Sequence, residues 1–358
     1  MYIYIHIPFC ASICSYCDFP KVLYDKKYIR SYLDSLKEEI LQRYKNEKVV
    51  SIYIGGGTPT SLEIEELEYL FRIISIFRLD EDIEFTIESN VESLTTDKIK
   101  LFNKYNVNRV SLGVQSLNDN TLKVLNRKHT KSDVFRVIND LKNNSINNIS
   151  IDYIYGVNNN IEEIKEDIST FLKLDIPHIS CYSLIIESNT IFGINKRKYI
   201  SDECEVEMYN YIRDTLTSNV YGQYEISNYS RDNYQSKHNL NYWNNGFYYG
   251  FGMGAVSYLD NYRINNTKNL TKYINKDYID RSDYEDRDIQ ISNTFMLGFR
   301  KTKGININDF KNRYNIDILN IEPVSRLITE GKLVLEDNHL FIHPSYLYLS
   351  NEIILEFI

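Results

Sequence analysis

Short apolar runs alternate with longer amphipathic stretches through the first half of the chain. The short runs predict strands at 2–7, 50–54, 84–88, 109–113, 149–155 and 178–184. Between them, apolar residues recur at helical spacing, as Leu33, Leu36 and Ile40 do, and predict helices at 28–44, 63–77, 97–105, 121–125, 132–143 and 162–172. Strands that alternate with such helices form parallel βαβ units with right-handed crossovers. Six units predict a partial parallel (β/α)6 barrel, with its chemistry at the carboxyl ends of the strands.

The pattern changes after about residue 188. Residues 204–218 predict another helix, whereas 221–262 is rich in Gly, Asn and aromatic residues and has no clear period. Near the end, predicted helices and two short strands follow one another and resemble a small winged-helix module. We therefore expect an α/β chain in three parts: a partial barrel at 1–190, an α+β extension at 191–283 and a C-terminal winged-helix-like domain at 284–358. The helices of that domain are expected at 284–299, 309–314 and 318–330, and its strands at 333–336 and 339–343.

Composition and charge narrow the class of protein. The 358 residues include 41 Lys and Arg against 49 Asp and Glu, which gives a net charge of −8. This acidic balance argues against nucleic acid as a partner, because nucleic-acid binding needs a basic face. No apolar run approaches the roughly 20 residues of a membrane span, and the start of the chain alternates like a strand rather than a signal peptide. We expect a cytoplasmic protein that reaches a membrane only through a partner.

Three of the five cysteines lie together, directly after the first strand. Cys10, Cys14 and Cys17 form a CxxxCxxC array, and thiolates are soft ligands that suit iron–sulfur clusters and zinc. Three thiolates can hold three irons of a [4Fe–4S] cluster and leave the fourth iron open. A structural zinc site needs four ligands, for which His6 is the nearby candidate. We predict the open cluster, with buried and inert thiols at Cys181 and Cys204.

A glycine run follows the second predicted strand, in the sequence Gly55-Gly56-Gly57-Thr58-Pro59. Alone it is a weak signal, because such runs often mark only a turn. It also lacks the lysine and the spacing of a phosphate-binding loop. Its position matters more, since it lies one βα unit after the cysteine loop and at the same end of the barrel. Bare backbone at that point can approach a small ligand closely.

Taken together, these motifs resemble the radical S-adenosylmethionine superfamily. The closer resemblance is to its coproporphyrinogen III oxidase-like branch, which includes heme chaperones. It runs nearly end to end and is carried by Tyr4–Cys10, Cys17–Phe19, Gly55–Pro59, Thr86–Asn90, Gly113–Ser116, Leu125–Arg127, Ile151–Gly156, Tyr224–Tyr229, His238–Trp243 and Leu349–Phe357.

The resemblance implies the cofactors and their ligands. Cys10, Cys14 and Cys17 would bind a [4Fe–4S] cluster, and S-adenosylmethionine would chelate its open iron. The residues implied to contact S-adenosylmethionine are Tyr4, Tyr16, Gly56, Gly57, Thr58, Glu88, Gln115, Arg127 and Asp152. A zwitterion with two ribose hydroxyls does need carboxylate acceptors and a guanidinium partner. Any one of these polar side chains, taken alone, is more often a helix cap or a surface charge.

Heme is the third ligand that the resemblance implies. It would be carried by His238 with Asn239, Tyr242 and Trp243, in an aromatic segment that suits a flat macrocycle. Imidazole is a common axial ligand of heme iron. An isolated histidine, however, is more often a structural side chain than a ligand.

Two functions compete at this point. One is a heme chaperone that binds heme and delivers it to apo-hemoprotein acceptors, including acceptors at the membrane. The alternative is an oxygen-independent coproporphyrinogen III oxidase, which converts propionates to vinyl groups, or another radical enzyme acting on a tetrapyrrole. Oxidases of this branch carry a fourth cysteine two residues after the third, where this chain has Phe19, and a long segment before the first strand. This chain begins at the strand itself, and both differences from the oxidases favour the chaperone. We expect a flavodoxin or ferredoxin as the electron donor.

Overall fold

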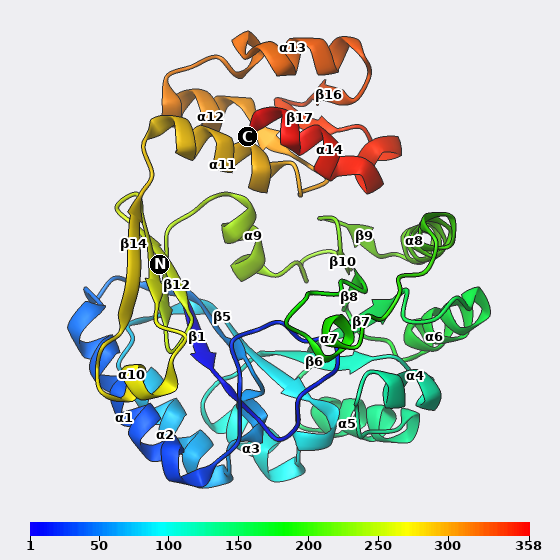
Figure 1. The fold of residues 1–358 in the computed structure, drawn as a ribbon. Coiled ribbons are helices and arrows are strands. Elements are labelled where there is room, and N and C mark those ends of the chain that lie inside the picture. The colour runs from blue at the N-terminus through cyan, green and yellow to red at the C-terminus, as the bar shows by residue number, and fades with distance from the viewer.

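A sheet of 12 strands organises most of the chain in the computed structural model, which describes residues 1–358. In Figure 1 the sheet curves through the lower part of the molecule, with helices along its outer side. Its centre consists of six neighbouring parallel strands: β1 (Tyr2–Ile7), β4 (Val49–Gly56), β5 (Leu79–Asn90), β6 (Arg109–Gln115), β7 (Asn148–Tyr155) and β8 (His178–Ser183). The predicted partial parallel barrel is confirmed.

Hydrophobic alternation explains how these strands are placed. In β1, Ile3, Ile5 and Ile7 are fully buried in the core beneath the helices, so Tyr4 and His6 face the interior of the barrel. The helices that follow the strands lie within a few residues of their predicted positions. They are α1 (Lys26–Arg43), α2 (Ile64–Ile74), α3 (Thr96–Lys104), α4 (Asp119–Val124), α5 (Lys131–Asn143) and α6 (Ile161–Lys173).

The residues after β8 extend the same sheet at both of its edges. After α7 (Ile191–Ile194) and α8 (Asp202–Thr217), the short strands β9 (Gly222–Gln223) and β10 (Asn228–Ser230) continue beside β8. The chain then forms α9 (Lys237–Trp243) and crosses to the other edge, where β11 (Tyr248–Phe251) pairs in parallel with β1. The antiparallel strands β12 (Val256–Leu259), β13 (Tyr262–Asn266) and β14 (Ile279–Tyr284) complete that edge, with α10 (Leu270–Ile274) between the last two.

A buried carboxylate ties these added strands to α1. Glu39 is fully buried and pairs with Arg43. It also accepts hydrogen bonds from the Gly252 N–H (2.9 Å), the Asn266 amide (2.7 Å) and the Tyr273 hydroxyl (2.6 Å). One side chain of α1 thus satisfies polar groups from the β11–β12 turn, β13 and α10.

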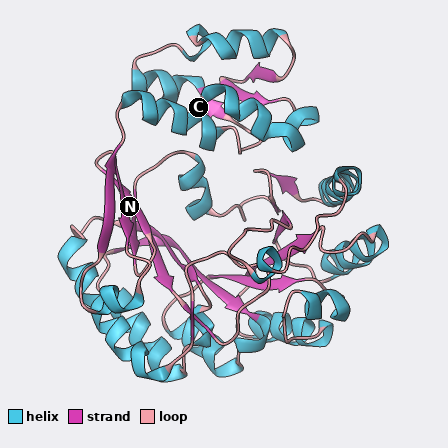
Figure 2. Ribbon diagram, in the orientation of Figure 1, coloured by secondary structure: helices cyan, strands magenta, loops and turns pink.

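The C-terminal region packs around a second hydrophobic core, which includes Phe295, Phe299, Val324, Leu340 and Phe357. Figure 2 shows it as a mainly helical layer with a few short strands. Its elements are α11 (Arg287–Gly298), α12 (Ile307–Tyr314), α13 (Glu322–Thr329), α14 (Ser350–Ile354) and a sheet of β15 (Ile305–Asn306), β17 (His339–Ile342) and β16 (Leu333–Glu336). A C-terminal module with antiparallel strands is therefore confirmed. None of the helices in the protein is long and apolar enough to cross a membrane.

Two boundaries in this region differ from prediction. The first helix starts at Arg287 rather than at residue 284, because Tyr284 still pairs with Tyr262 in the sheet. The helix predicted at 318–330 is split into a 3-10 turn at Ile318–Asn320 and α13. Pro323 lies in the first turn of α13, where its missing N–H costs nothing, so it favours a new helix start.

Candidate functional site

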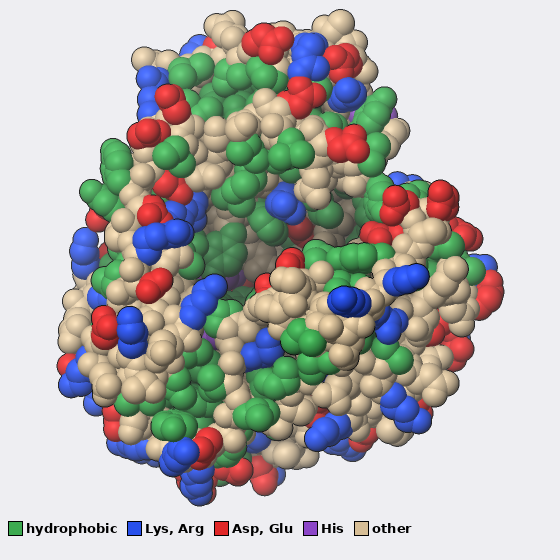
Figure 3. Space-filling view, viewed as in Figure 1, with side chains coloured by type: hydrophobic (Ala, Val, Ile, Leu, Met, Phe, Trp, Pro, Cys, Tyr) green, Lys and Arg blue, Asp and Glu red, His purple; other side chains and the backbone are tan.

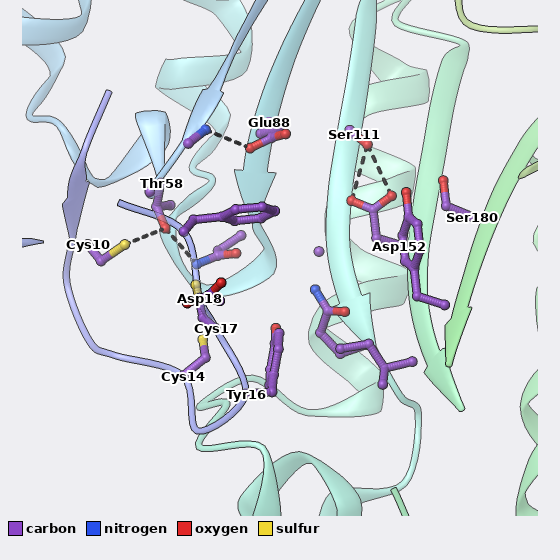
Figure 4. A pocket seen from close by; sticks show the side chains of 18 of the residues that line it. Cys10, Cys14, Tyr16, Cys17, Asp18, Thr58, Glu88, Ser111, Asp152 and Ser180 are labelled. Atoms are coloured by element: carbon purple, nitrogen blue, oxygen red, sulfur yellow. Dashed lines mark hydrogen bonds between the residues drawn. The ribbon is translucent and has the colours of Figure 1, made fainter. Parts of the chain in front are cut away.

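A concave site lies inside the barrel, toward the carboxyl ends of the parallel strands. It is a cavity of about 460 Å³ lined by the cysteine loop and by residues of β4 to β8. Figure 3 shows a hollow at the centre of this face, below the C-terminal helices. In Figure 4 the three cysteines lie on one side of the pocket, and Ser111, Asp152 and Ser180 lie on the strands across from them.

The cysteine loop is held at this position by backbone pairing. Cys10 ends the short strand β2 (Phe9–Cys10), which pairs with β3 (Val22–Leu23). At its far side the loop is fastened to α4 and its C-terminal turn, since the Ser15 N–H donates to the Leu125 carbonyl (3.2 Å) and the Asn126 amide donates to the Ile13 carbonyl (2.7 Å). All three cysteines are free thiols that line the cavity.

Two polar groups approach the thiol sulfurs directly. The Thr58 hydroxyl lies 3.6 Å from Cys10 Sγ, and an Arg127 Nη lies 3.7 Å from Cys14 Sγ. Burial raises the pKa of the Cys10 thiol to about 11, so this thiol stays protonated at neutral pH unless a metal displaces the proton. These thiols and a buried cation beside them fit the requirements of a thiolate-bound iron–sulfur cluster.

The glycine run brings backbone against the cavity because side chains would not fit there. Gly56 has a φ of +110°, and a Cβ atom at this position would lie 2.5 Å from the His6 ring. At Gly57 a Cβ would lie 2.7 Å from the Pro8 carbonyl and 3.0 Å from Cys10 Sγ. The run is therefore required for close approach and does more than mark a turn.

Two carboxylates on nearby strands face the same cavity. Glu88 on β5 accepts hydrogen bonds from the Tyr53 hydroxyl (2.9 Å) and the Gly56 N–H (3.0 Å). Asp152 on β7 accepts from the Ser111 hydroxyl. Burial, and then the neighbouring Asp152, raise the pKa of Glu88 to about 7. Burial also raises the pKa of Asp152 to about 6. Both carboxylates can accept further hydrogen bonds, and hydroxyl donors from a ligand would favour their charged forms.

Arg127 and Gln115 complete the polar lining near the cysteines. The Arg127 guanidinium is buried and donates to Asn90 Oδ1 (2.9 Å), the Gly113 carbonyl (2.7 Å) and Glu92 (3.1 Å). Gln115 has a φ of +69° at the end of β6, where the register with β7 shifts. Gln115 lines the cavity together with Arg109 and Ser111 of the same strand.

The two tyrosines with implied cofactor contacts are placed differently. Tyr16 lines the cavity beside the cysteines. Tyr4 does not line it, and its hydroxyl bonds to His6 Nδ1 at 2.9 Å. His6 Nε2 in turn bonds to the Pro20 carbonyl at 2.8 Å. Tyr4 therefore contacts the cysteine loop through His6, whose two ring nitrogens are both engaged.

The segment with implied heme contacts forms α9, and its histidine does not line the cavity. His238 is buried, with Nδ1 bonded to the Ser51 hydroxyl (3.0 Å) and Nε2 bonded to the Tyr242 hydroxyl (2.8 Å). Burial lowers the pKa of its ring to about 3. Of the four residues only Asn239 lines the cavity; Trp243 lies near Arg300 instead. In this conformation neither ring nitrogen of His238 is free to bind iron.

Sequence reasoning missed Arg109 and Asn90. Arg109 begins β6 and lines the cavity, while its buried Nε and Nη1 have no hydrogen-bond partner. Its charge offsets those of Glu88 and Asp152 and lowers the pKa of both. Asn90 links Thr58 to Arg127: its amide N–H donates to the Thr58 hydroxyl (3.0 Å), and its Oδ1 accepts from the Arg127 guanidinium (2.9 Å). The strict alternation of β6, in which Arg109, Ser111 and Gln115 share a face, was the available signal for Arg109.

The remaining cysteines differ from each other. Cys181 is buried on β8, as expected, and burial raises its pKa. Cys204, in contrast, is partly exposed near the start of α8, where its N–H is capped by Ser201. The expectation that both are buried is wrong for Cys204, because the buried residues of α8 begin only at Met208.

Comparison with known proteins places this geometry in a family. Residues 4–171 match the Radical SAM superfamily, and residues 286–345 match the HemN C-terminal domain. A protein from Lactococcus lactis named heme chaperone HemW is 36% identical over 367 residues, covering 99% of this chain and 96% of the relative. A protein of the same name from Bacillus subtilis is 34% identical over 369 residues, covering 98% and 97%.

A solved structure shows the same fold. Coproporphyrinogen III oxidase (HemN) from Escherichia coli, described as a radical SAM enzyme, matches with a TM-score of 0.87 over 99% of this chain and 89% of that one. At 20% sequence identity, this likeness concerns the fold. The relatives from Lactococcus lactis and Bacillus subtilis match nearly from end to end. The chain therefore belongs to the HemW family within the radical S-adenosylmethionine superfamily.

Proposed function

We propose that Cys10, Cys14 and Cys17 hold a [4Fe–4S] cluster and that S-adenosylmethionine binds beside it in the same cavity. The support is the donor set: three free thiols on one loop line a cavity with a buried guanidinium and two carboxylates. When bound, such a cluster supplies an open iron for the amino and carboxylate groups of the nucleotide and an electron for its reductive cleavage. The protein itself provides binding, orientation and shielding from water.

Each polar side chain has a separate task in this proposal. Arg127, beside Cys14, offers positive charge to the methionyl carboxylate, because its guanidinium is held in place by Asn90 and the Gly113 carbonyl. Glu88 and Asp152 accept hydrogen bonds from the ribose hydroxyls, which would favour their charged forms. The Gly56–Thr58 backbone lines the amino end, and Gln115 and Tyr16 shape the surrounding wall. Tyr4 acts only through its hydrogen bond to His6.

We further propose that the chain binds heme and delivers it to apo-hemoproteins. The observation that carries this is the end-to-end similarity to proteins named heme chaperones. Asn239 lines the cavity, so a ligand there contacts α9 directly. His238 can serve as an axial ligand only after the Tyr242 hydroxyl leaves its Nε2. Acceptors in the cytoplasm or at a membrane, and a flavodoxin or ferredoxin as electron donor, belong to the same proposal.

The test separates the chaperone from the oxidase. Anaerobically reconstituted protein should carry about four irons per chain, bind added hemin and convert an apo-cytochrome to its holo form. The Cys14→Ser variant should lose the iron, and the Cys181→Ser variant should keep it. The same preparation, given coproporphyrinogen III, S-adenosylmethionine and a reductant, should form no vinyl product. Formation of vinyl product without heme transfer would show that the chain is an oxidase and not a chaperone.

A further inference from the structure

Three apolar side chains from two segments keep large exposed surfaces while lining one cavity. Phe19 and Ile185 are each 65% exposed, and Tyr182 is 40% exposed. Phe19 follows the last cysteine of the loop, Tyr182 lies near the end of β8, and Ile185 lies just beyond that strand. We call these three residues the apolar shelf. Exposed apolar side chains gathered at a cavity mark a ligand surface, because exposure to water is unfavourable for them.

The shelf is held in place by bonds between its two loops. The Asn189 amide donates to the Asp18 carboxylate, next to Phe19. The Phe192 N–H donates to the Ser15 carbonyl at 3.0 Å. The loop after β8 is thereby fastened to the cysteine loop, so a ligand on the shelf lies beside the proposed cluster site.

The charges around the shelf are mixed and include one cation with an unused donor. Lys21 Nζ donates to the carbonyls of Cys17 (2.6 Å) and Phe19 (3.2 Å), which leaves the third N–H of the ammonium for a ligand. Lys21 lines the cavity, as do the carboxylates of Asp18 and Glu187. A ligand that fits is therefore largely apolar and carries a carboxylate that can reach Lys21.

We propose that the apolar shelf is the surface on which the tetrapyrrole macrocycle lies, with a propionate directed to Lys21. This inference rests on the proposed heme-binding function and assigns it a place. A flat macrocycle covers Phe19, Tyr182 and Ile185, and Asn239 borders the same cavity. Affinity on this surface comes from apolar contact and needs no iron ligand, so the engaged ring nitrogens of His238 do not prevent it.

Metal-free protoporphyrin IX is the decisive probe, because it has the macrocycle and propionates of heme but no iron. Protoporphyrin fluorescence and hemin absorbance would be titrated against wild type and the Phe19→Ser/Ile185→Ser variant. Losing two apolar contacts should lower the affinity for both probes by roughly 10-fold or more. Phe19→Leu/Ile185→Leu should retain most of the affinity. The matched control is Leu41→Ser, since Leu41 is 59% exposed on α1 and lines no part of the cavity.

Two further measurements decide between explanations. The iron content after reconstitution should be the same in wild type and the Phe19→Ser/Ile185→Ser variant, which shows that the cysteine loop is intact. Hemin should bind wild type more tightly than its dimethyl ester does, and Lys21→Gln should remove this difference. Unchanged protoporphyrin affinity in the double serine variant would overturn the shelf while leaving the proposed function intact. A wild-type protein that binds neither probe would overturn the proposed function and the shelf together.

Discussion

Replacing Glu88 by Gln should stabilise the cofactor-free protein while impairing its site. Burial and the neighbouring Asp152 raise the pKa of Glu88 from 4.5 to about 7. The folded chain therefore binds more protons than the unfolded chain between those pH values, and its stability falls as the pH rises from about 4.5 to 7. The difference corresponds to roughly 3 kcal/mol above pH 7. A glutamine has no charge to bury and avoids this cost. It has only one acceptor oxygen, however, so it loses the hydrogen bond from either the Tyr53 hydroxyl or the Gly56 N–H, which costs about 1 kcal/mol.

The net gain is about 2 kcal/mol at pH 8, and it should vanish or change sign near pH 4.5. Urea unfolding of the cluster-free chain at these two pH values measures it, and Glu65→Gln, at an exposed position outside the cavity, is the control. In the reconstituted protein the same Glu88→Gln change should weaken S-adenosylmethionine binding by roughly 10-fold, because a charged acceptor is lost. A variant that is less stable than wild type at pH 8 would refute the reasoning. So would an equal difference at both pH values.

Other substitutions test three separate parts of the structure. Arg127→Met should weaken S-adenosylmethionine binding to the reconstituted protein by roughly 10-fold or more in calorimetry. Arg127→Lys should have an intermediate affinity, because lysine keeps the charge but cannot make the two parallel hydrogen bonds of a guanidinium. Glu39→Ala should lower the free energy of unfolding by about 3–5 kcal/mol in urea titrations, since it removes the carboxylate from Arg43 and the acceptor from Gly252, Asn266 and Tyr273. A loss below about 1 kcal/mol would contradict the role of this carboxylate. Tyr242→Phe should tighten hemin binding by freeing Nε2 of His238, and His238→Ala should loosen it, both measured by Soret titration. Equal hemin affinity in both variants and wild type would show that His238 is not an iron ligand.

The parallel strands and their helices could be predicted because their signals are local. Ile3, Ile5 and Ile7 alternate along one strand, and each strand is followed by an apolar stripe at helical spacing. The strands after β8 could not be predicted in this way. They are two to six residues long, and they pair at two opposite edges of the sheet. What stabilises them is long-range contact, such as the bonds that Glu39 accepts from Asn266 and Tyr273.

For the candidate site, too, the local features could be predicted from the sequence and the long-range contacts could not. The spacing of Cys10, Cys14 and Cys17 predicted a three-thiol loop, because ligands on one loop need only local chain geometry. The positions of Arg109 and Asn90 in the cavity were missed, since their importance depends on partners from other strands. The orientation of His238 could not be predicted either, because Ser51 and Tyr242 form hydrogen bonds to its ring nitrogens only in the folded chain.

By itself, the sequence determined the order of strands and helices up to β8, the cysteine loop and the bare glycine backbone beside it. These follow from periodicity and from spacing within a few residues. Tertiary structure alone decided that Glu88 and Asp152 share a buried cavity with raised pKa values, that Arg109 stands near them, and that the chain beyond β8 returns to the other edge of the sheet. The physical reason is that burial and electrostatic coupling arise between segments far apart in the chain, and only the packed sheet brings those segments together.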